Sequence, residues 1–228
     1  MSIALSQQSR PILFSLCNWG FAGVRTWGAE ISSSWRMSGD IQPNWARILD
    51  IMNQNTFYLD SIDFWGHPDM DMLEVGNNIH GPEARTHFAL WAAMKSPLLI
   101  GTDLSKISQD DLAILKNKYL LAFNQDPTFG RPARPYKWGT NPDYTFNATF
   151  PAEFWSGPSS AGTLVLTFNP FSDQKNKTVF WSEIPELKAQ DHWKVTDIWS
   201  GNELGCIQEG FEVPVKGHDT AGYLVNTC

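Results

Sequence analysis

The first half of the chain alternates short apolar runs with longer segments whose apolar residues recur at helical spacing. Short apolar runs bounded by Pro, Gly or Asn are typical of strands buried on both faces, and apolar residues three or four apart indicate amphipathic helices. The pattern predicts strands at 11–17, 34–37, 71–75 and 97–101. It predicts helices at 24–31, at 43–52 with Pro43 in the first position, at 83–95, and at 108–115 behind a capping box of Ser108 and Asp111.

This alternation of strand and helix, repeated about four times, predicts parallel β/α units with right-handed crossovers. Four units cannot close a barrel, and there is no room for more before the first predicted strand. After Asn124-Gln-Asp-Pro the pattern changes to two-residue alternation at 163–169, 177–181, 193–199, 211–215 and 222–225. We therefore predict an α/β domain over residues 1–125, followed by an all-β antiparallel domain, a sandwich, over residues 126–228.

Composition narrows the class of protein. Charged residues make up 18% of the sequence and hydrophobic residues 42%, which indicates a globular chain. The net charge of −7 argues against nucleic acid or an anionic membrane as a partner. Residues 1–10 have neither a basic start nor an apolar run, so we expect no signal peptide in this chain, and no stretch is long enough to span a bilayer. Eleven tryptophans suit either sugar rings or a hydrophobic core.

Three cysteines allow at most one internal disulfide, and we expect it between Cys206 and Cys228. Cys17 acts as a nucleophile only beside a base, and no histidine lies in the neighbouring segments, so an apolar wall is its simpler role. Asn147-Ala-Thr and Asn176-Lys-Thr are acceptor sequences for N-glycosylation, which are typical of secreted eukaryotic proteins.

Polar residues follow each apolar run of the first half, where loops at the carboxyl ends of parallel strands converge. Arg36 and Asp40 stand four residues apart beside a Ser-Gly breaker, so they form either a surface ion pair or part of a site. Asp40 is a candidate general acid. Asp71 is a candidate acceptor for substrate hydroxyls or a strand-end cap, and Asp69 is expected in a turn.

Three histidines, His67, His80 and His87, are candidate metal ligands, but their spacing matches no standard zinc pattern. No Gly-rich phosphate loop follows the first predicted strand. We therefore expect neither a metal nor a cofactor. The predicted β domain shows no recognisable group of acids, histidines or nucleophiles, so we expect an accessory role for it.

Several stretches together resemble one family, the eukaryotic melibiase-type α-galactosidases of glycoside hydrolase family 27, in their plant and fungal branch. They run in family order over residues 10–127: Ile12-Leu-Phe-Ser-Leu-Cys-Asn-Trp-Gly20, Ser34-Trp-Arg-Met-Ser-Gly-Asp-Ile41, Pro68-Asp-Met-Asp-Met-Leu-Glu-Val-Gly-Asn77, residues 83–101, Asp103-Leu104 and Asn124-Gln-Asp-Pro127. The resemblance implies the C-terminal half of a (β/α)8 TIM barrel followed by an antiparallel β-sandwich. It also implies a secreted, retaining hydrolase that removes terminal non-reducing α-D-galactose from oligosaccharides and galactosides.

The resemblance implies roles for individual residues. Asp40 matches the family's acid/base, which protonates the leaving oxygen and later deprotonates water. Arg36 matches an arginine that binds a sugar hydroxyl near the reacting centre. Asp71, with Met72 beside it, matches an aspartate that binds hydroxyls across the ring.

Cys17 and Trp19 match positions that line the pocket near the 2-hydroxyl, and the bulk of Trp19 disfavours a 2-acetamido sugar and hence an α-N-acetylgalactosaminidase. The family's nucleophile lies in a Lys-x-Asp motif on the fourth barrel strand, and no such motif precedes Ile12. We therefore expect a fragment with the last four β/α units, without activity of its own and prone to self-associate through open barrel edges.

Two alternatives remain open. A non-catalytic galactose-binding module would keep the sugar contacts without turnover. An inverting pair would join Asp40 with Asp69 or Asp71, which requires carboxyl groups about 6.5 to 9.5 Å apart.

Overall fold

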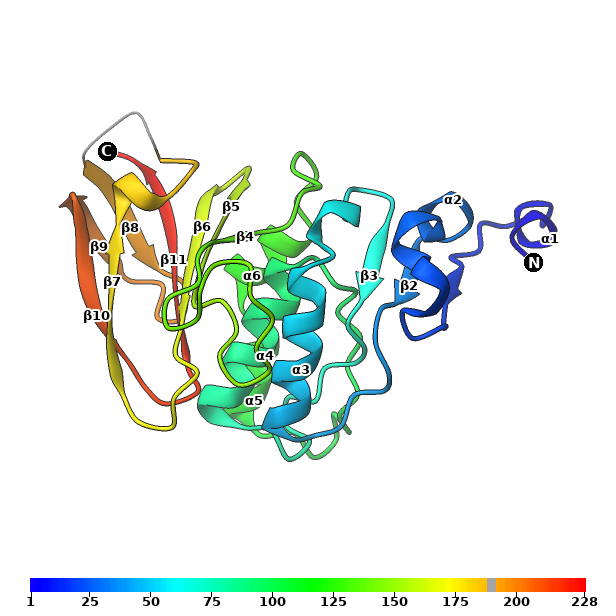
Figure 1. The fold of residues 1–228 in the computed structure, drawn as a ribbon, viewed down its shortest axis with the longest axis horizontal. Helices are drawn as coiled ribbons and strands as arrows, with labels where there is room; N and C mark the ends of the chain where they lie inside the picture. Colours follow the sequence, from blue (N-terminus) through cyan, green and yellow to red (C-terminus); the bar gives the residue numbers. More distant parts are fainter. Residues whose placement is uncertain (188–191) are drawn as a thin grey trace.

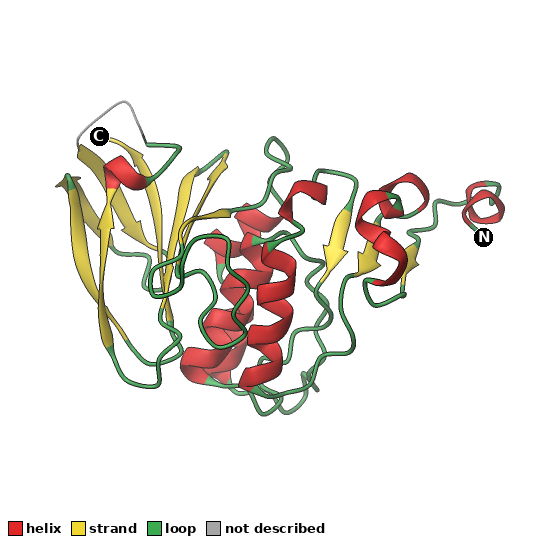
Figure 2. Cartoon of the chain, viewed as in Figure 1, coloured by secondary structure: helices red, strands yellow, loops and turns green. Residues whose placement is uncertain are grey.

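The computed structural model describes residues 1–187 and 192–228, and Figure 1 shows a parallel β/α part and a β-sandwich on either side of a layer of helices. The three parallel strands form one sheet in the order β1-β2-β3. Helices α3 to α6 lie between this sheet and the sandwich (Figures 1 and 2). The elements of this part are α1 (Ser2–Ser6), β1 (Ser15–Leu16), η1 (Phe21–Thr26), α2 (Gly28–Ile31), β2 (Ser34–Arg36), α3 (Trp45–Thr56), η2 (Leu59–Ser61), β3 (His67–Asp69), α4 (Gly81–Ala93), α5 (Gln109–Leu115) and α6 (Lys118–Asn124).

The second part is antiparallel. Six strands form one sheet in the order β4-β5-β6-β11-β8-β9, and β10 pairs with β7 in another. Its elements are β4 (Arg134–Lys137), β5 (Phe154–Ser159), β6 (Gly162–Phe168), β7 (Lys175–Phe180), η3 (Trp181–Glu183), β8 (His192–Asp197), β9 (Glu203–Gln208), β10 (Gly210–Val215) and β11 (Thr220–Thr227). The predicted fold class, a partial β/α barrel followed by an antiparallel β-sandwich, is confirmed.

The two-residue period of β6 places its side chains in two different cores. Leu164, Leu166 and Phe168 pack in the core that contains the helices. Val165, between them in sequence, packs in the core between the two sheets of the sandwich. Because successive strand residues point to opposite faces, the six-stranded sheet is covered on one face by helices and on the other by β7 and β10.

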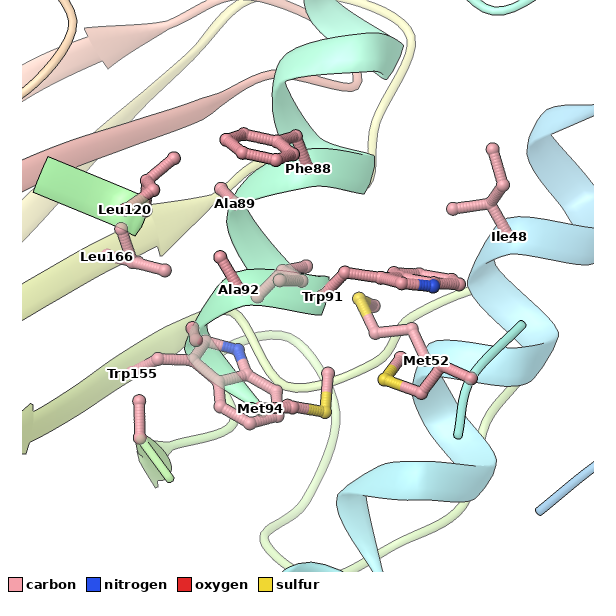
Figure 3. Packing of buried hydrophobic residues seen from close by; sticks show 14 of the residues in the cluster. Ile48, Met52, Phe88, Ala89, Trp91, Ala92, Met94, Leu120, Trp155 and Leu166 are labelled. Atoms are coloured by element: carbon pink, nitrogen blue, oxygen red, sulfur yellow. The ribbon is translucent and has the colours of Figure 1, made fainter. Parts of the chain in front are cut away.

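The helical core joins both parts of the chain. Figure 3 shows the indole of Trp91 reaching from α4 toward Ile48 and Met52 of α3, while Trp155 and Leu166 approach from the sandwich. All five side chains are buried. A continuous apolar core of this kind favours cooperative folding of the helices with the sandwich.

Contacts at the start of α4 connect it to the turn between β10 and β11. Thr86 Oγ1 donates to the carbonyl oxygen of His218 over 2.7 Å. Arg85 Nε lies 2.9 Å from Asp219 Oδ1, and its guanidinium stacks over the ring of Trp199 at 4.3 Å. These polar contacts complement the apolar packing between the helix and the sandwich.

The first predicted strand is shorter and more exposed than expected. Strand pairing is limited to Ser15 and Leu16, and β1 has β2 as its one neighbour in the sheet of the described residues. Leu13 is 79% exposed. The prediction of burial on both faces is wrong, because side chains of this segment point away from the protein and remain in contact with solvent.

The predicted strands at 71–75 and 97–101 are also wrong. The third strand is β3, which ends at Asp69, and the following residues form a loop. Leu73 and Ile100 form an isolated parallel bridge between the two segments, and Leu99 and Ile100 are about half exposed. Leu73 and Val75 are buried loop side chains, which produce the same apolar run as a strand.

Three of the four predicted helices are confirmed as α3, α4 and α5, and Ser108 Oγ accepts from the Asp111 N–H as a helix cap. The segment at 24–31 is instead two short pieces, η1 and α2. Helix α3 begins after Asn44, whose side chain accepts from the Arg47 N–H, so Pro43 precedes the cap. Among the described residues, no helix combines the length and the apolar content that crossing a membrane requires.

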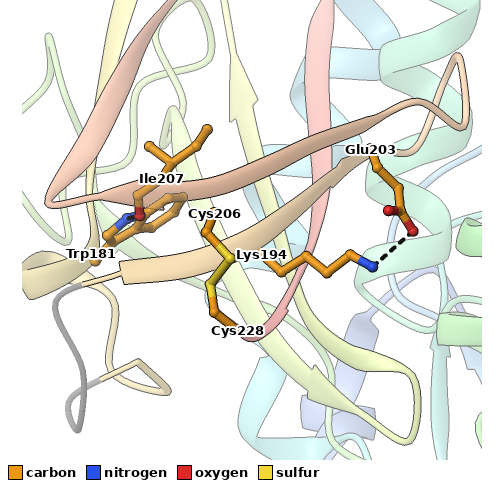
Figure 4. Close-up of a disulfide and its surroundings, with 6 residues drawn as sticks. All are labelled: Trp181, Lys194, Glu203, Cys206, Ile207 and Cys228. Atoms are coloured by element: carbon orange, nitrogen blue, oxygen red, sulfur yellow. Dashed lines mark hydrogen bonds and ion pairs between the residues drawn. A yellow bond between two sulfur atoms is a disulfide. The ribbon is translucent and has the colours of Figure 1, made fainter.

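The predicted disulfide is present. Cys206 on β9 is bonded to Cys228, the residue after β11 (Figure 4). Cys17 is a free, exposed cysteine. Near the disulfide, Lys194 Nζ lies 2.9 Å from Glu203 Oε1 and joins β8 to the edge strand β9.

Candidate active site

The carboxyl ends of β2 and β3 bring together four side chains, which we call the Arg36 cluster: Arg36, Asp40, Asp69 and Asp71. Arg36 ends β2, and Asp69 ends β3 directly opposite it in the register. The Nη2 atom of Arg36 lies 3.0 Å from Asp40 Oδ1 and 2.6 Å from Asp71 Oδ2. One guanidinium therefore pairs with two carboxylates from two different loops.

The two carboxylates differ sharply in exposure. The Asp40 side chain is 68% exposed, whereas that of Asp71 is 8% exposed. Arg36 and Asp40 form an ion pair, and the same guanidinium also pairs with a buried carboxylate. An exposed carboxyl group beside a cation can exchange protons with a ligand, and the buried one can hold the cation in place.

Asp71 is held by several backbone contacts. Its Oδ2 accepts from the Ile41 N–H over 2.8 Å, and its Oδ1 accepts from the Met72 N–H over 2.9 Å. Its φ of 78° lies in the left-handed region, which is unfavourable for a residue with a Cβ. Trp91 Nε1 donates to its carbonyl oxygen and Asp69 Oδ1 accepts from its N–H, so neighbouring groups stabilise this conformation.

Burial shifts the pKa values of Asp69, a member of the cluster, and of His87 on α4. Burial raises the pKa of Asp69, while the hydrogen bond from the Asp71 N–H and the charge of Arg36 act in the opposite direction. Burial lowers the pKa of His87 to about 3, so its imidazole is neutral at ordinary pH. His87 Nε2 accepts from the Glu74 N–H over 2.9 Å and supports the loop that follows Asp71.

The other predicted site residues lie in loops at the same end of the sheet. Cys17 and Trp19 follow β1, and Trp19 is 48% exposed with a left-handed φ of 56°. The Gly20 N–H donates to the carbonyl oxygen of Arg36 over 3.0 Å, which ties this loop to β2. Met72 follows Asp71 and is partly exposed. Across residues 1–187 and 192–228, no hydrogen bond or ion pair joins the side chains of Cys17, Trp19 or Met72 to the Arg36 cluster.

The three histidines occupy separate places. Each histidine has a different polar partner. His67 contacts the carbonyl oxygen of Lys95, and His80 contacts Asp111 Oδ2. His87 accepts from the Glu74 N–H. In the part of the chain that the structure describes, no three His, Cys, Asp or Glu side chains are arranged to hold a metal ion.

Two residues that contact Asp71 were not predicted as part of the site from the sequence. Asp69 was expected in a turn, but it ends β3 and is buried against the Asp71 N–H. Trp91 is buried in the core, and its indole N–H donates to the Asp71 carbonyl. The Asp-x-Asp spacing of Asp69 and Asp71 is the one sequence feature that indicates their pairing.

Comparison with known proteins agrees with the fold. Residues 1–126 match the family model described as alpha galactosidase A, and residues 149–225 match the alpha galactosidase C-terminal beta sandwich domain. The chain is 59% identical over 230 residues to the probable alpha-galactosidase B of Talaromyces emersonii, which covers 96% of this chain and 51% of the relative. It is 57% identical over 228 residues to the probable alpha-galactosidase B of Penicillium simplicissimum, covering 99% of this chain and 52% of the relative.

The chain thus spans about half the length of these curated relatives. Among solved structures, the crystal structure of alpha-galactosidase I from Mortierella vinacea superposes with a TM-score of 0.88 at 27% identity. That match covers 100% of this chain and 62% of the other. Since one family model covers more than half of the sequence and a second covers most of the sandwich, the chain belongs to the melibiase-type α-galactosidase family.

Proposed function

We propose that this chain supplies the acid/base half of a retaining α-galactosidase site, which hydrolyses terminal non-reducing α-D-galactose from oligosaccharides and galactosides. The main support is the Arg36 guanidinium placed between the exposed Asp40 and the buried Asp71 at the carboxyl ends of adjacent parallel strands. Chemistry in β/α barrels is concentrated at that end of the sheet. The descriptions of the curated relatives supply the substrate class.

In this proposal Asp40 is the acid/base. Its exposed carboxyl group can reach the glycosidic oxygen, donate a proton to it, and later accept one from water. Arg36 binds a sugar hydroxyl close to the reacting carbon. Asp71 and Met72 contact the sugar across the ring.

An inverting pair of Asp40 and Asp71 does not fit these distances. Both carboxylates bond to the same Nη2 atom, so the two bonded oxygens lie no further apart than 3.0 Å and 2.6 Å together. That separation is shorter than the roughly 6.5 to 9.5 Å that leaves room for an attacking water. Asp71 is also a poor nucleophile, because both of its oxygens already accept backbone hydrogen bonds.

We therefore propose that the nucleophilic carboxylate is supplied by polypeptide outside this sequence, about 5 to 5.5 Å from Asp40 in the assembled site. The chain alone then has no hydrolytic activity. Cys17 and Trp19 line the assembled pocket near the 2-hydroxyl. The ring of Trp19, which is accessible in the loop after β1, occupies the space that an acetamido group would need.

The test uses release of p-nitrophenol from p-nitrophenyl α-D-galactoside. The chain alone is expected to release none, whereas the chain joined to the part of the Talaromyces emersonii relative that it does not cover is expected to be active. Asp40→Asn in the joined protein should remove at least about 99% of that activity. Measurable turnover by the chain alone would refute the assignment of the nucleophile.

Calorimetric titration separates the enzyme from a binding module. If galactose binds both the chain and its Asp40→Asn variant while the joined protein remains inactive, the protein is a galactose-binding module. N-acetylgalactosamine is the matched control ligand, and equal affinity for both sugars would contradict the role of Trp19.

We also propose that the protein is secreted. The Cys206–Cys228 disulfide is favoured by an oxidising compartment, and Asn176 of one glycosylation sequence is exposed on β7. The disulfide-bonded, N-glycosylated protein is expected in the culture medium of cells that produce it. A reduced, unglycosylated protein confined to the cell extract would contradict secretion.

A further inference from the structure

Asp40 lies in the loop between β2 and α3, and its exposed side chain has few contacts that fix its position. Its carboxylate pairs with Arg36. An acid/base must nevertheless stand at a defined distance from the glycosidic oxygen, because proton transfer depends steeply on geometry. The position of the Asp40 backbone therefore matters as much as its side-chain partner.

Arg47, in the first turn of α3, binds that backbone directly. Its Nε donates to the carbonyl oxygen of Asp40 over 2.9 Å, and its Nη2 donates to the carbonyl oxygen of Gly39. The two acceptors are consecutive peptide groups, which suits the fixed fork of N–H donors on a planar guanidinium. A lysine carries a single ammonium group in place of the planar fork of donors, so it cannot reproduce this geometry.

The guanidinium is itself oriented along one face of α3. Arg47 Nη1 forms an ion pair with Asp50, and Gln54 Nε2 donates to Asp50 Oδ1 over 3.0 Å. The spacings of three and four residues place the three side chains on the same helix face. The buried opposite face of α3 packs in the helical core, so Arg47 projects from a fixed element.

The peptide that follows Asp40 is fixed from the other side. The Ile41 N–H donates to the buried Asp71 Oδ2, and Ile41 is itself buried. The Cα of Asp40 thus lies between the 39–40 peptide, whose carbonyl oxygen is bound by Arg47, and the 40–41 peptide, whose amide is bound by Asp71. If Arg47 is lost, only one of these two restraints remains.

We propose that Arg47 is the positioning residue of the acid/base Asp40, an inference that rests on the proposed function of this chain. Arg47 contacts neither the Asp40 carboxylate nor the sugar-binding groups. It acts by holding the peptide groups of residues 39 and 40, so its loss affects the proton-transfer step and leaves sugar binding intact. A displacement of about 1 Å at a catalytic group costs on the order of a hundredfold in rate.

The dependence on the leaving group tests this role. In the joined protein, kcat/KM of Arg47→Met should fall about 10- to 100-fold on methyl α-D-galactoside, whose alkoxide needs a proton to leave. On 2,4-dinitrophenyl α-D-galactoside, whose leaving group departs unprotonated, the fall should stay under about threefold. Arg47→Lys should lie between the wild type and Arg47→Met. The matched control is Arg134→Met, which removes an exposed arginine paired with Asp60, and both substrates should be unaffected.

Equal losses on both substrates would assign Arg47 a merely structural role, and no loss on either would exclude any role; each result overturns the proposal. An inactive joined protein with wild-type Arg47 would count against the proposed function instead. Hydrogen–deuterium exchange on the chain alone then decides the inference. We expect the Ile41 amide to exchange at least about tenfold faster in Arg47→Met, with α3 and α4 unchanged, and an unchanged Ile41 rate would overturn it.

Discussion

Acid should destabilise this protein through one buried histidine. The His87 side chain is fully buried on α4, where Nε2 accepts from the Glu74 N–H. Burial lowers its pKa from 6.5 to about 3. The substitution His87→Gln keeps a side-chain acceptor of similar reach and removes the titratable group.

The sign and the size follow from the two pKa values. The unfolded chain binds a proton at His87 as the pH falls below 6.5, whereas the folded chain does so only near pH 3. Protonation therefore favours the unfolded state, and stability is lost as the pH falls through this window. The loss is about 1.4 kcal/mol per pH unit below 6.5, which amounts to about 2 kcal/mol between pH 7 and pH 5.

Urea unfolding at pH 7, 6 and 5 measures this loss. The free energy of unfolding of the wild type should fall by about 2 kcal/mol more than that of His87→Gln over this range. The comparison isolates His87, because Asp69 and Asp219, whose pKa values are raised by burial, act in the opposite direction and are present in both proteins. Parallel pH profiles, or an imidazole that titrates near pH 6.5 by NMR, would refute the reasoning.

Three further predictions concern the stability and assembly of the chain. Arg85→Ala leaves the Asp219 carboxylate buried without its cation and should cost about 3 kcal/mol by urea unfolding, of which Asp219→Asn in the same protein should recover a part. Replacing Cys206 and Cys228 by Ser opens a loop of 22 residues and should cost about 3 kcal/mol in the same assay, whereas an unchanged midpoint would contradict it. The chain alone should form dimers or larger species in light scattering, because Leu13 and the open β1 edge are exposed; a monodisperse monomer would contradict this.

The sandwich was predictable where apolar residues recur at two-residue spacing along its strands. Strands β6, β7, β8, β10 and β11 overlap the predicted ranges, with ends shifted by up to two residues. The missed strands lack that alternation. Strand β5 is buried over its first four residues and contains Gly157 and Pro158, which usually interrupt strands, and β9 is an edge strand exposed along most of its length.

The sequence predicts the part of the site that is formed by residues close together along the chain. Arg36 ends a strand, and Asp40 follows it beside a Ser-Gly break, so spacing alone places them together. The second carboxylate on the same guanidinium comes from the next β/α unit, and its burial depends on tertiary contacts with Ile41 and Trp91. The hydrophobic periodicity of the sequence does not indicate contacts between residues that are far apart along the chain.

Helix α4 explains how the β-sandwich can influence the site. At its start, Arg85 and Thr86 bind the turn at 218–220, which fixes the helix to the sandwich. Directly after them, His87 supports the loop beyond Asp71, and one turn further Trp91 donates to the Asp71 carbonyl. Because these contacts lie within two turns of one continuous helix, a shift of the sandwich turn reaches the strained backbone of Asp71 through α4. The sandwich therefore contributes to the Arg36 cluster by fixing the helix that holds its buried carboxylate.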